Sequence, residues 1–187
     1  MFPGKQAISF TVEFLKIALI SLLIILPIRY FVVQPFFVRG ASMEPAFYNG
    51  DYLIVDEISY RLNAPARGDV AIFQFPDDIS QYYIKRIVGL PGETIEVRDG
   101  SIYIQEAGEK EFKKISESYI DSLNTPGNLL VELQDDEVFV LGDNRMASYD
   151  SRQWGGLPLK YIVGRAWIRA WPFEAFKVIK GISYFLQ

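Results

Sequence analysis

Hydrophobic and polar residues follow two different patterns along this chain. The N-terminal part contains an uninterrupted apolar run, Ile17–Ile28. From about residue 30 onward, short apolar runs rich in Val, Ile, Phe and Tyr are separated by Gly, Pro and Asp. The first pattern predicts one apolar helix, and the second predicts a domain of closely spaced strands. We therefore divide the chain into residues 1–30 and residues 31–187.

The apolar run has three interpretations: a membrane span, a cleaved secretory signal, and a buried helix of a soluble domain. Twelve helical residues cover roughly 18 Å of the ~30 Å hydrocarbon core, but the flanks extend the segment to Phe14–Val33. Lys16 and Arg29 near its ends could reach the headgroups, and no A-x-A-like cleavage site follows. Pro27 is expected to kink the helix or end it early. We predict a transmembrane anchor, and the charges on its two sides lean slightly toward an N-terminus inside.

The remaining pattern predicts a mainly β domain with few helices. The expected strands are residues 30–38, 51–58, 69–75, 82–89, 94–105, 137–142 and 161–170. The pair Asp99-Gly100 predicts a tight hairpin turn inside segment 94–105. The charged stretch 106–127 is interpreted as a peripheral insertion with one short helix, Lys113–Leu123, so that residues 94–137 form a small inserted hairpin or cap region. The tail, residues 173–187, is interpreted as an interfacial or packed helix.

Composition excludes several classes of function. The net charge is −4 with a pI of about 5.0, and no Lys/Arg stripe is visible, which argues against nucleic-acid binding. The chain contains neither cysteine nor histidine. Disulfides, thiolate zinc sites, a cysteine nucleophile and a Ser-His-Asp triad are therefore all excluded. If the protein uses an activated hydroxyl, the base must be a lysine, a carboxylate or the N-terminal amine.

Four segments carry candidate chemistry: 40-GASMEP-45, 49-NGDYLIV-55, 82-YYIKRIVGLPGE-93 and 142-GDNRMASYDSR-152. Taken singly, each has a plain structural interpretation. Ser42 fits an ordinary turn, Lys85 fits an edge strand protected from aggregation, and residues 142–152 fit a solvated loop with ion pairs. The second segment is interpreted only as a turn that leads into a strand.

A catalytic interpretation of Lys85 requires a lowered pKa. In a strand, Lys85 shares one face with Tyr83 and Ile87, which is an apolar setting for an amine. At the reference pKa of about 10.4, roughly 0.4% of lysines are neutral at pH 8. Burial that lowered the pKa by about 2.4 units would make half of them neutral, so that the amine could serve as a base.

Together the four segments resemble the type I signal peptidase family. The nucleophile motif of that family is similar to Ser42-Met43-x-Pro45, the lysine motif to the run that begins at Lys85, and the last motif to residues 142–152 without a gap. The resemblance covers roughly Val33–Trp171. It implies an antiparallel β catalytic domain with one N-terminal transmembrane helix. It also implies a membrane-bound serine endopeptidase that removes signal peptides from secreted preproteins after a small-x-small site.

The resemblance also implies roles for the residues of the catalytic centre. Ser42 is expected to attack the scissile carbonyl, neutral Lys85 to take its proton, and Ser148 to hydrogen-bond the lysine amine. The Ser42 backbone N–H is expected to form part of the oxyanion hole. Some family members carry a serine where Gly40 stands here, so the second oxyanion donor is left open, with a backbone N–H at Gly40 as one candidate.

Supporting and substrate-binding roles follow from the same resemblance. Asp143 is expected to pair with Arg86, and Asp150 with Arg152, as structural braces. Phe47 replaces a smaller residue of the family pattern and is expected to reshape the pocket floor. Two shallow pockets for small side chains are expected to be lined by Phe36, Val38, Met43, Tyr83 and Ile84. The substrate strand is expected to add to the sheet edge beside Ser42.

The implied partners are the signal peptides of preproteins, the lipid bilayer and a nearby secretion translocon. No cofactor, metal or nucleic acid is expected. The implied location is the bacterial plasma membrane, with one span, a cytoplasmic N-terminus and an extracytoplasmic catalytic domain. Two alternatives are a catalytically inactive, membrane-anchored β-domain that binds peptides and a self-cleaving repressor. The second conflicts with the short, apolar segment ahead of Ser42.

Overall fold

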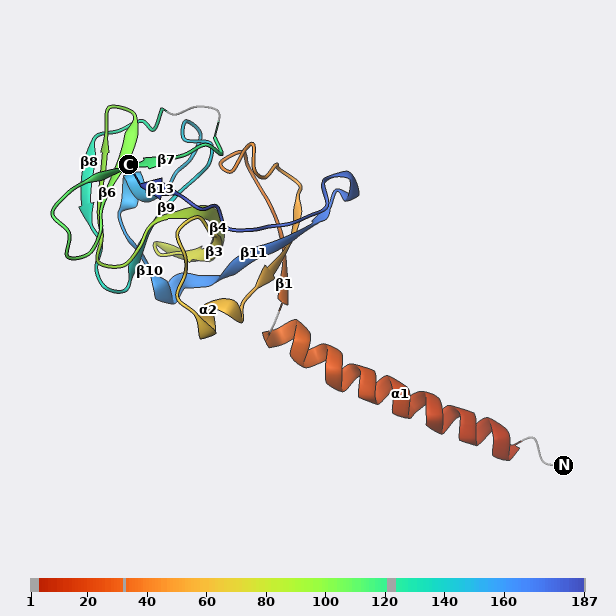
Figure 1. Ribbon diagram of the computed structural model, residues 1–187. Coiled ribbons are helices and arrows are strands. Elements are labelled where there is room, and N and C mark those ends of the chain that lie inside the picture. The colour runs from red at the N-terminus through yellow and green to blue at the C-terminus, as the bar shows by residue number, and fades with distance from the viewer. Residues whose placement is uncertain (1–3, 32, 121–123, 187) are drawn as a thin grey trace.

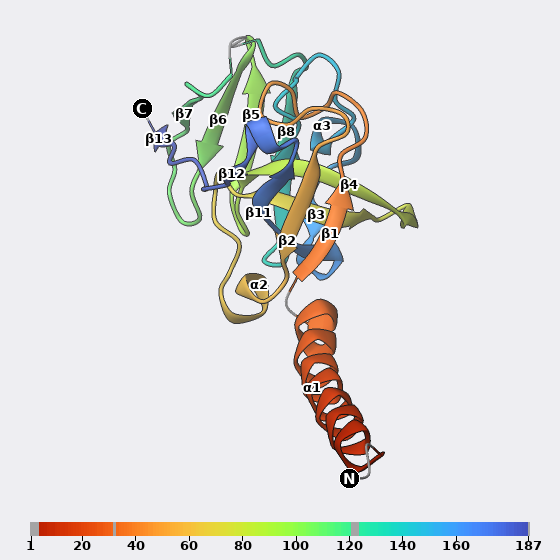
Figure 2. The ribbon, with the colours of Figure 1, turned by 90° about the vertical axis from the view of Figure 1, so that its right-hand side faces the viewer.

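A long helix and a β-domain make up the protein. The computed structural model describes the backbone of residues 4–31, 33–120 and 124–186, with side chains described except at 4–9, 26–31, 33 and 185–186. Helix α1, Gly4–Phe31, points away from the domain in both ribbon views (Figures 1 and 2). It continues past Pro27, so the expected early end at this proline is wrong. The strand predicted for residues 30–38 is correspondingly shorter.

The described side chains of α1, Phe10–Ile25, are all exposed. Most are large and apolar, and they occur on every side of the helix rather than along one stripe. Among the described residues, no helix is both long enough and apolar enough to cross a membrane. The predicted span, Phe14–Val33, extends beyond Ile25, where the continuous run of described side chains ends.

Eight of the described strands form one antiparallel sheet, in the order β1-β2-β11-β3-β4-β9-β10 with β12 paired to β11 (Figures 1 and 2). β2 alternates buried and partly exposed side chains, as the two-residue period of a half-buried strand requires, whereas β3, the second half of β4 and β9 are buried over nearly their whole length. β1 is an edge strand. The strands are β1 Val33–Phe37, β2 Tyr52–Asp56, β3 Val70–Phe75, β4 Asp78–Gly89, β9 Glu137–Leu141, β10 Leu157–Pro158, β11 Ile162–Trp171 and β12 Lys177–Val178.

A second antiparallel sheet has the order β13-β7-β6-β5-β8 within the described residues. The predicted hairpin turn is confirmed, because Asp99 and Gly100 join β5 to β6 with φ angles of 49° and 71°. Both positive values are what a two-residue hairpin turn of this hand needs. The strands are β5 Thr94–Arg98, β6 Ser101–Gln105, β7 Lys113–Ser116, β8 Leu129–Glu132 and β13 Phe185–Leu186.

Helices in the described part of the β-domain are short. They are α2 Ser59–Leu62 and α3 Ser151–Trp154, with the 3₁₀ turns η1 Leu159–Tyr161 and η2 Phe173–Ala175. The mainly β antiparallel class is therefore confirmed. All seven predicted strand segments contain strands, while β7, β8, β10, β12 and β13 were not predicted.

Two predicted helices are wrong. Residues 113–116 form β7 instead of the start of a helix, because they pair with β6 and bury Ile115 in the core. Residues 121–123 of that prediction lie outside the described residues. The tail is extended rather than helical, because Lys177–Val178 pairs with β11 and Phe185–Leu186 with β7. In both segments, pairing with distant strands outweighs local helix preference.

The two sheets share a core that includes side chains of β4 and β9. Val88, Phe139 and Leu141 of the first sheet pack against Ile95 and the β5–β6 hairpin of the second. These side chains are almost completely buried. The second half of β4, which carries Lys85, is therefore held between packed layers, whereas its first half is exposed.

Candidate active site

Ser42 lies in a turn that follows β1. The Val38 N–H donates to the Asp51 carbonyl at 2.9 Å, and the Phe47 N–H donates to the Met43 carbonyl at 2.8 Å, so the turn is closed on itself. Met43 and Phe47 point into the core cluster with Val38 and anchor the turn from below. Ser42 itself remains partly exposed.

Lys85 lies in the buried half of β4 and is 4% exposed. Its Nζ donates to Ser42 Oγ at 2.8 Å and to the Ile84 carbonyl at 3.1 Å. Ser42 and Lys85 are 43 positions apart in the sequence, and the fold brings their reactive atoms into hydrogen-bond contact.

Burial lowers the pKa of Lys85 from 10.5 to about 8, because the apolar surroundings disfavour the ammonium form. The carboxylates of Asp150 and Asp143 act in the opposite direction and raise this pKa, but burial outweighs them. About half of the amines are therefore neutral at pH 8, which is the state that a base requires.

The loop after β9 packs directly against the Ser42 turn. The Asn144 N–H donates to the Ser42 carbonyl at 3.0 Å, and Asn144 Nδ2 donates to the Ala41 carbonyl at 3.1 Å. Gly142 is required at its position, because a Cβ there would lie 2.4 Å from the Ser42 carbonyl oxygen and 2.2 Å from Ser148 Oγ. The close approach of the Ser42 backbone and the Ser148 side chain leaves no room for a side chain at Gly142.

Ser148 is placed beside this contact, but the predicted hydrogen bond to the Lys85 amine is absent. Its Oγ is buried and has no hydrogen-bond partner in the part of the chain that the structure describes. Here Lys85 Nζ instead donates to the Ile84 carbonyl, which the sequence did not predict. The Ser148 carbonyl accepts from Arg152 Nη2 at 3.3 Å.

Both predicted ion pairs are present. Arg86 donates to Asp143 through Nε at 2.8 Å and through Nη2 at 2.6 Å, and both residues are buried. Arg152 donates to Asp150 through Nε at 2.8 Å and Nη2 at 3.0 Å. Asp150 also accepts from the Gly142 N–H at 3.0 Å and caps α3, so it connects both ends of the loop. The bidentate Arg86–Asp143 pair holds the loop against β4, and the Arg152–Asp150 pair braces the loop internally.

Oxyanion donors are only partly supplied. Among the described residues, none accepts a hydrogen bond from the Ser42 N–H, so this donor can face a substrate carbonyl. The Gly40 N–H donates to Asn49 Oδ1 at 3.0 Å. The candidate second donor at Gly40 is therefore already occupied in this structure.

A groove of about 760 Å³ runs past Ser42 and Lys85 between β1 and β4. Four of the five predicted pocket residues line it, namely Phe36, Val38, Tyr83 and Ile84. Met43 does not line it, because its side chain lies in the core below the turn. Phe47 is likewise a core residue and does not line the groove. The lining residues that the sequence did not predict include Leu53, Ile72, Gln81, Tyr82 and Tyr149.

Three residues near the site, Asn144, Arg145 and Glu117, were not predicted from the sequence. Asn144 and Arg145 lie inside a recognised motif but received no role. Arg145 forms a buried ion pair with Glu117, whose segment was interpreted as peripheral. No local signal marks Glu117, because its partner lies 28 positions away.

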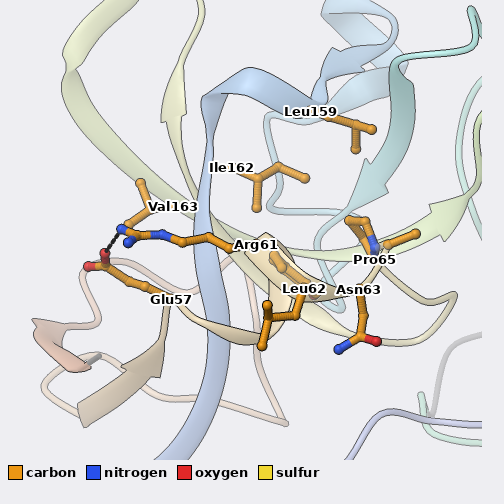
Figure 3. Close-up of a pocket in the computed structure, with 10 residues that line it drawn as sticks. Glu57, Arg61, Leu62, Asn63, Pro65, Leu159, Ile162 and Val163 are labelled. Carbon is orange, nitrogen blue, oxygen red and sulfur yellow. Dashed lines mark hydrogen bonds and ion pairs between the residues drawn. The ribbon is translucent and has the colours of Figure 1, made fainter. Parts of the chain in front are cut away.

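A second hollow of about 470 Å³ lies beside α2 and contains none of the predicted site residues (Figure 3). Leu62, Leu159 and Ile162 contribute apolar walls, and Arg61 donates to Glu57 at 3.2 Å on one side. This arrangement offers a charge pair and aliphatic contacts, and the described residues that line it include neither a serine nor a lysine. The contact between Ser42 and Lys85 lies in the other groove.

Comparisons with known proteins identify the family of this chain. Residues 11–171 match the family described as signal peptidase, peptidase S26. The chain is 35% identical to the "Probable signal peptidase I-1" of Synechocystis sp., over 97% of this chain and 93% of that protein. It is 37% identical to signal peptidase I of Leptolyngbya laminosa, over 89% and 83% of the two chains. A crystal structure of a signal peptidase I from Enterococcus faecalis matches with 31% identity and a TM-score of 0.47, covering 55% of this chain and 97% of that one.

Proposed function

Because the chain belongs to the peptidase S26 family of signal peptidases and removes signal peptides from preproteins, we propose that Ser42 is its nucleophile and Lys85 its general base. The observation that carries this proposal is the 2.8 Å contact between Lys85 Nζ and Ser42 Oγ in a buried, apolar setting. A chain without histidine or cysteine needs such an amine to activate a hydroxyl.

The proposed reaction has two stages. Neutral Lys85 takes the proton of Ser42 Oγ as this oxygen attacks the scissile carbonyl carbon, and the resulting ammonium gives the proton to the leaving amine. The acyl-enzyme ester is then hydrolysed by a water that Lys85 activates in the same way. The Ser42 N–H stabilises the oxyanion in both stages. Ser148 is left outside the proton transfer, because its Oγ has no partner among the described residues.

The groove supports a preference for small side chains before the cleavage site. The walls from β1 and β4 approach closely, since the rings of Phe36 and Tyr82 have centroids 5.3 Å apart. β1 is an edge strand, so an extended peptide can add to the sheet beside Ser42. We propose that alternate substrate residues, at positions −1 and −3, point into the apolar floor, which favours an A-x-A pattern.

We also propose that α1 anchors the enzyme in the bacterial plasma membrane, with the N-terminus inside and the catalytic domain outside, near the secretion translocon. Two features support an anchor. α1 projects from the domain (Figure 1), and its described side chains are exposed and largely apolar on every side. A helix that is apolar all round is typical of a lipid or protein interior. Protease treatment of intact spheroplasts should digest the β-domain while residues 1–13 stay protected.

Cleavage of a preprotein with an A-x-A site tests the dyad. The wild-type protein should cleave at this site, and Ser42→Ala and Lys85→Ala should each lower kcat at least ~10³-fold. Ser101→Ala and Lys114→Ala, both on the second sheet, are the matched controls and should retain activity. Normal cleavage by Lys85→Ala would exclude the lysine as base, and no cleavage by the wild type would favour a peptide-binding module.

A further inference from the structure

Three consecutive residues of the loop after β9 make different contacts around the catalytic centre. Asp143 binds Arg86, the neighbour of Lys85, at 2.6 and 2.8 Å. Asn144 holds the carbonyls of Ala41 and Ser42. Arg145 contacts its own loop, because its Nε donates to the Gly142 carbonyl at 3.1 Å. The orientation of Asn144 therefore depends on what holds the residue that follows it.

Glu117 holds Arg145. Arg145 donates through Nη1 to Glu117 Oε2 at 2.8 Å and through Nη2 to Glu117 Oε1, so the pair is bidentate. The two side chains are 2% and 6% exposed. Arg145 Nη1 also donates to Thr125 Oγ1. Glu117 and Thr125 both come from the segment between β7 and β8, outside the matched catalytic motifs.

Tyr119 extends this contact toward the catalytic strand. Its hydroxyl donates to Glu117 Oε1 at 2.8 Å and accepts from Arg145 Nη2 at 3.0 Å. The Arg86 guanidinium lies over the Tyr119 ring, with 4.7 Å between Arg86 Cζ and the ring centroid. The Tyr184 hydroxyl of the C-terminal tail lies 2.7 Å from the Tyr119 hydroxyl. Burial raises the pKa of both tyrosines, so both stay neutral hydrogen-bonding groups near neutral pH.

We propose that Glu117 is a positioning residue for peptide cleavage: through Arg145 it holds Asn144 against the Ser42 turn, and with Tyr119 it supports Arg86 beside Lys85. This inference rests on the proposed Ser42–Lys85 dyad. Proton transfer within the dyad depends on the 2.8 Å contact, and a displacement of about 1 Å can lower a rate on the order of 10²-fold.

Glu117 does not line the substrate groove, and neither does Arg145. Loss of the Glu117 charge should therefore affect the chemical step more than substrate binding. In Glu117→Gln, Arg145 keeps its buried charge but loses its carboxylate partner, so its guanidinium must move toward another acceptor. We expect kcat to fall by about 10- to 100-fold with KM within about twofold of the wild-type value.

Glu93 ends the segment 82–93 but has no assigned role in catalysis and does not line the groove, so it provides a matched control. Arg67 donates to Glu93 through Nη1 at 2.9 Å and Nη2 at 2.5 Å, with side chains 12% and 7% exposed. In the described structure neither residue bonds to residues 142–145. Glu93→Gln therefore breaks an equally bidentate, buried Arg–Glu pair without touching the catalytic loop, and should change stability but not kcat of the folded enzyme.

The experiment measures kcat and KM of full-length wild type, Glu117→Gln and Glu93→Gln in detergent, well below each variant's thermal unfolding midpoint. A selective fall of kcat in Glu117→Gln supports the proposal. Wild-type kcat in Glu117→Gln, or an equal fall in Glu93→Gln, overturns it. Failure of the wild type to cleave would instead count against the proposed dyad.

Tyr119→Phe tests the positioning role of Glu117 if Glu117→Gln does not fold. This variant keeps the ring under Arg86 but removes the hydroxyl that joins Glu117 to Arg145. We expect kcat to fall several-fold at unchanged KM, while Tyr103→Phe on β6, away from these groups, leaves both constants unchanged. A Tyr119→Phe enzyme with wild-type kcat overturns the proposal.

Discussion

The protonation of Lys85 should control the pH dependence of cleavage. Burial moves its pKa from 10.5 to about 8. At pH 8 about half of the amines are then neutral, compared with roughly 0.3% for an exposed lysine, which is a gain of about 150-fold in competent base. At pH 7 the neutral fraction is about 9%, and at pH 9 it is about 91%.

The assay is kcat/KM for a preprotein between pH 6 and 10 at constant ionic strength. We expect a tenfold rise per pH unit below pH 7, a midpoint near pH 8 and a plateau above about pH 9. A profile that is flat from pH 6 to 9 would refute a lysine base. A rate that still rises tenfold per unit between pH 9 and 10 would refute burial as the cause of the lowered pKa.

Removing the Asp150 carboxylate tests the direction in which nearby charges shift the pKa of Lys85. Asp150 raises the pKa of Lys85 against the effect of burial, so Asp150→Asn should move the midpoint to lower pH. The variant also leaves Arg152 without its carboxylate, which acts in the same direction. Asp56→Asn is the control, since Asp56 pairs with Arg165 and does not line the groove of Lys85. A midpoint moved to higher pH would contradict the electrostatic reasoning.

Three further outcomes are expected. Lys85→Met should raise the free energy of unfolding at pH 7 by up to about 3 kcal/mol, because about 2.5 pKa units separate the folded and unfolded amine. The free energy of unfolding of the wild type should rise between about pH 8 and 10.5, because in this range only the unfolded chain binds the Lys85 proton. Urea unfolding of Lys85→Met should show no such rise. Asp143→Leu should lower the free energy of unfolding by about 3–5 kcal/mol, because Arg86 stays buried without its carboxylate partner. A loss below about 1 kcal/mol would be evidence against a buried pair. Gly142→Ala should abolish cleavage while circular dichroism stays that of a β protein, because its methyl group collides with the Ser42 carbonyl and Ser148; full activity would contradict the close approach.

The strands of five or more residues and the main turn could be predicted from the sequence, because short apolar runs bounded by turn residues and an Asp-Gly pair are local signals. The helix errors have the opposite origin. Residues 113–116 and the C-terminal tail are charged or short, and their strand pairing is set by β6, β7 and β11, which are distant in the sequence. Local propensity carries no information about such partners.

The candidate site shows the same division. The absence of histidine and cysteine and the motifs around Ser42, Lys85 and residues 142–152 lead to a prediction of the reactive groups, because residue chemistry is a local property. The two ion pairs of the last motif were also anticipated and are present.

Only the tertiary structure decided how these groups work. It brings an amine within 2.8 Å of a hydroxyl 43 positions away and removes enough water to lower its pKa. It leaves Ser148 Oγ without a described partner, occupies the Gly40 N–H, moves Met43 into the core and places Glu117 behind the catalytic loop. Hydrogen bonds and desolvation depend on atoms within a few ångströms, and in a β-domain most such neighbours are remote in the sequence.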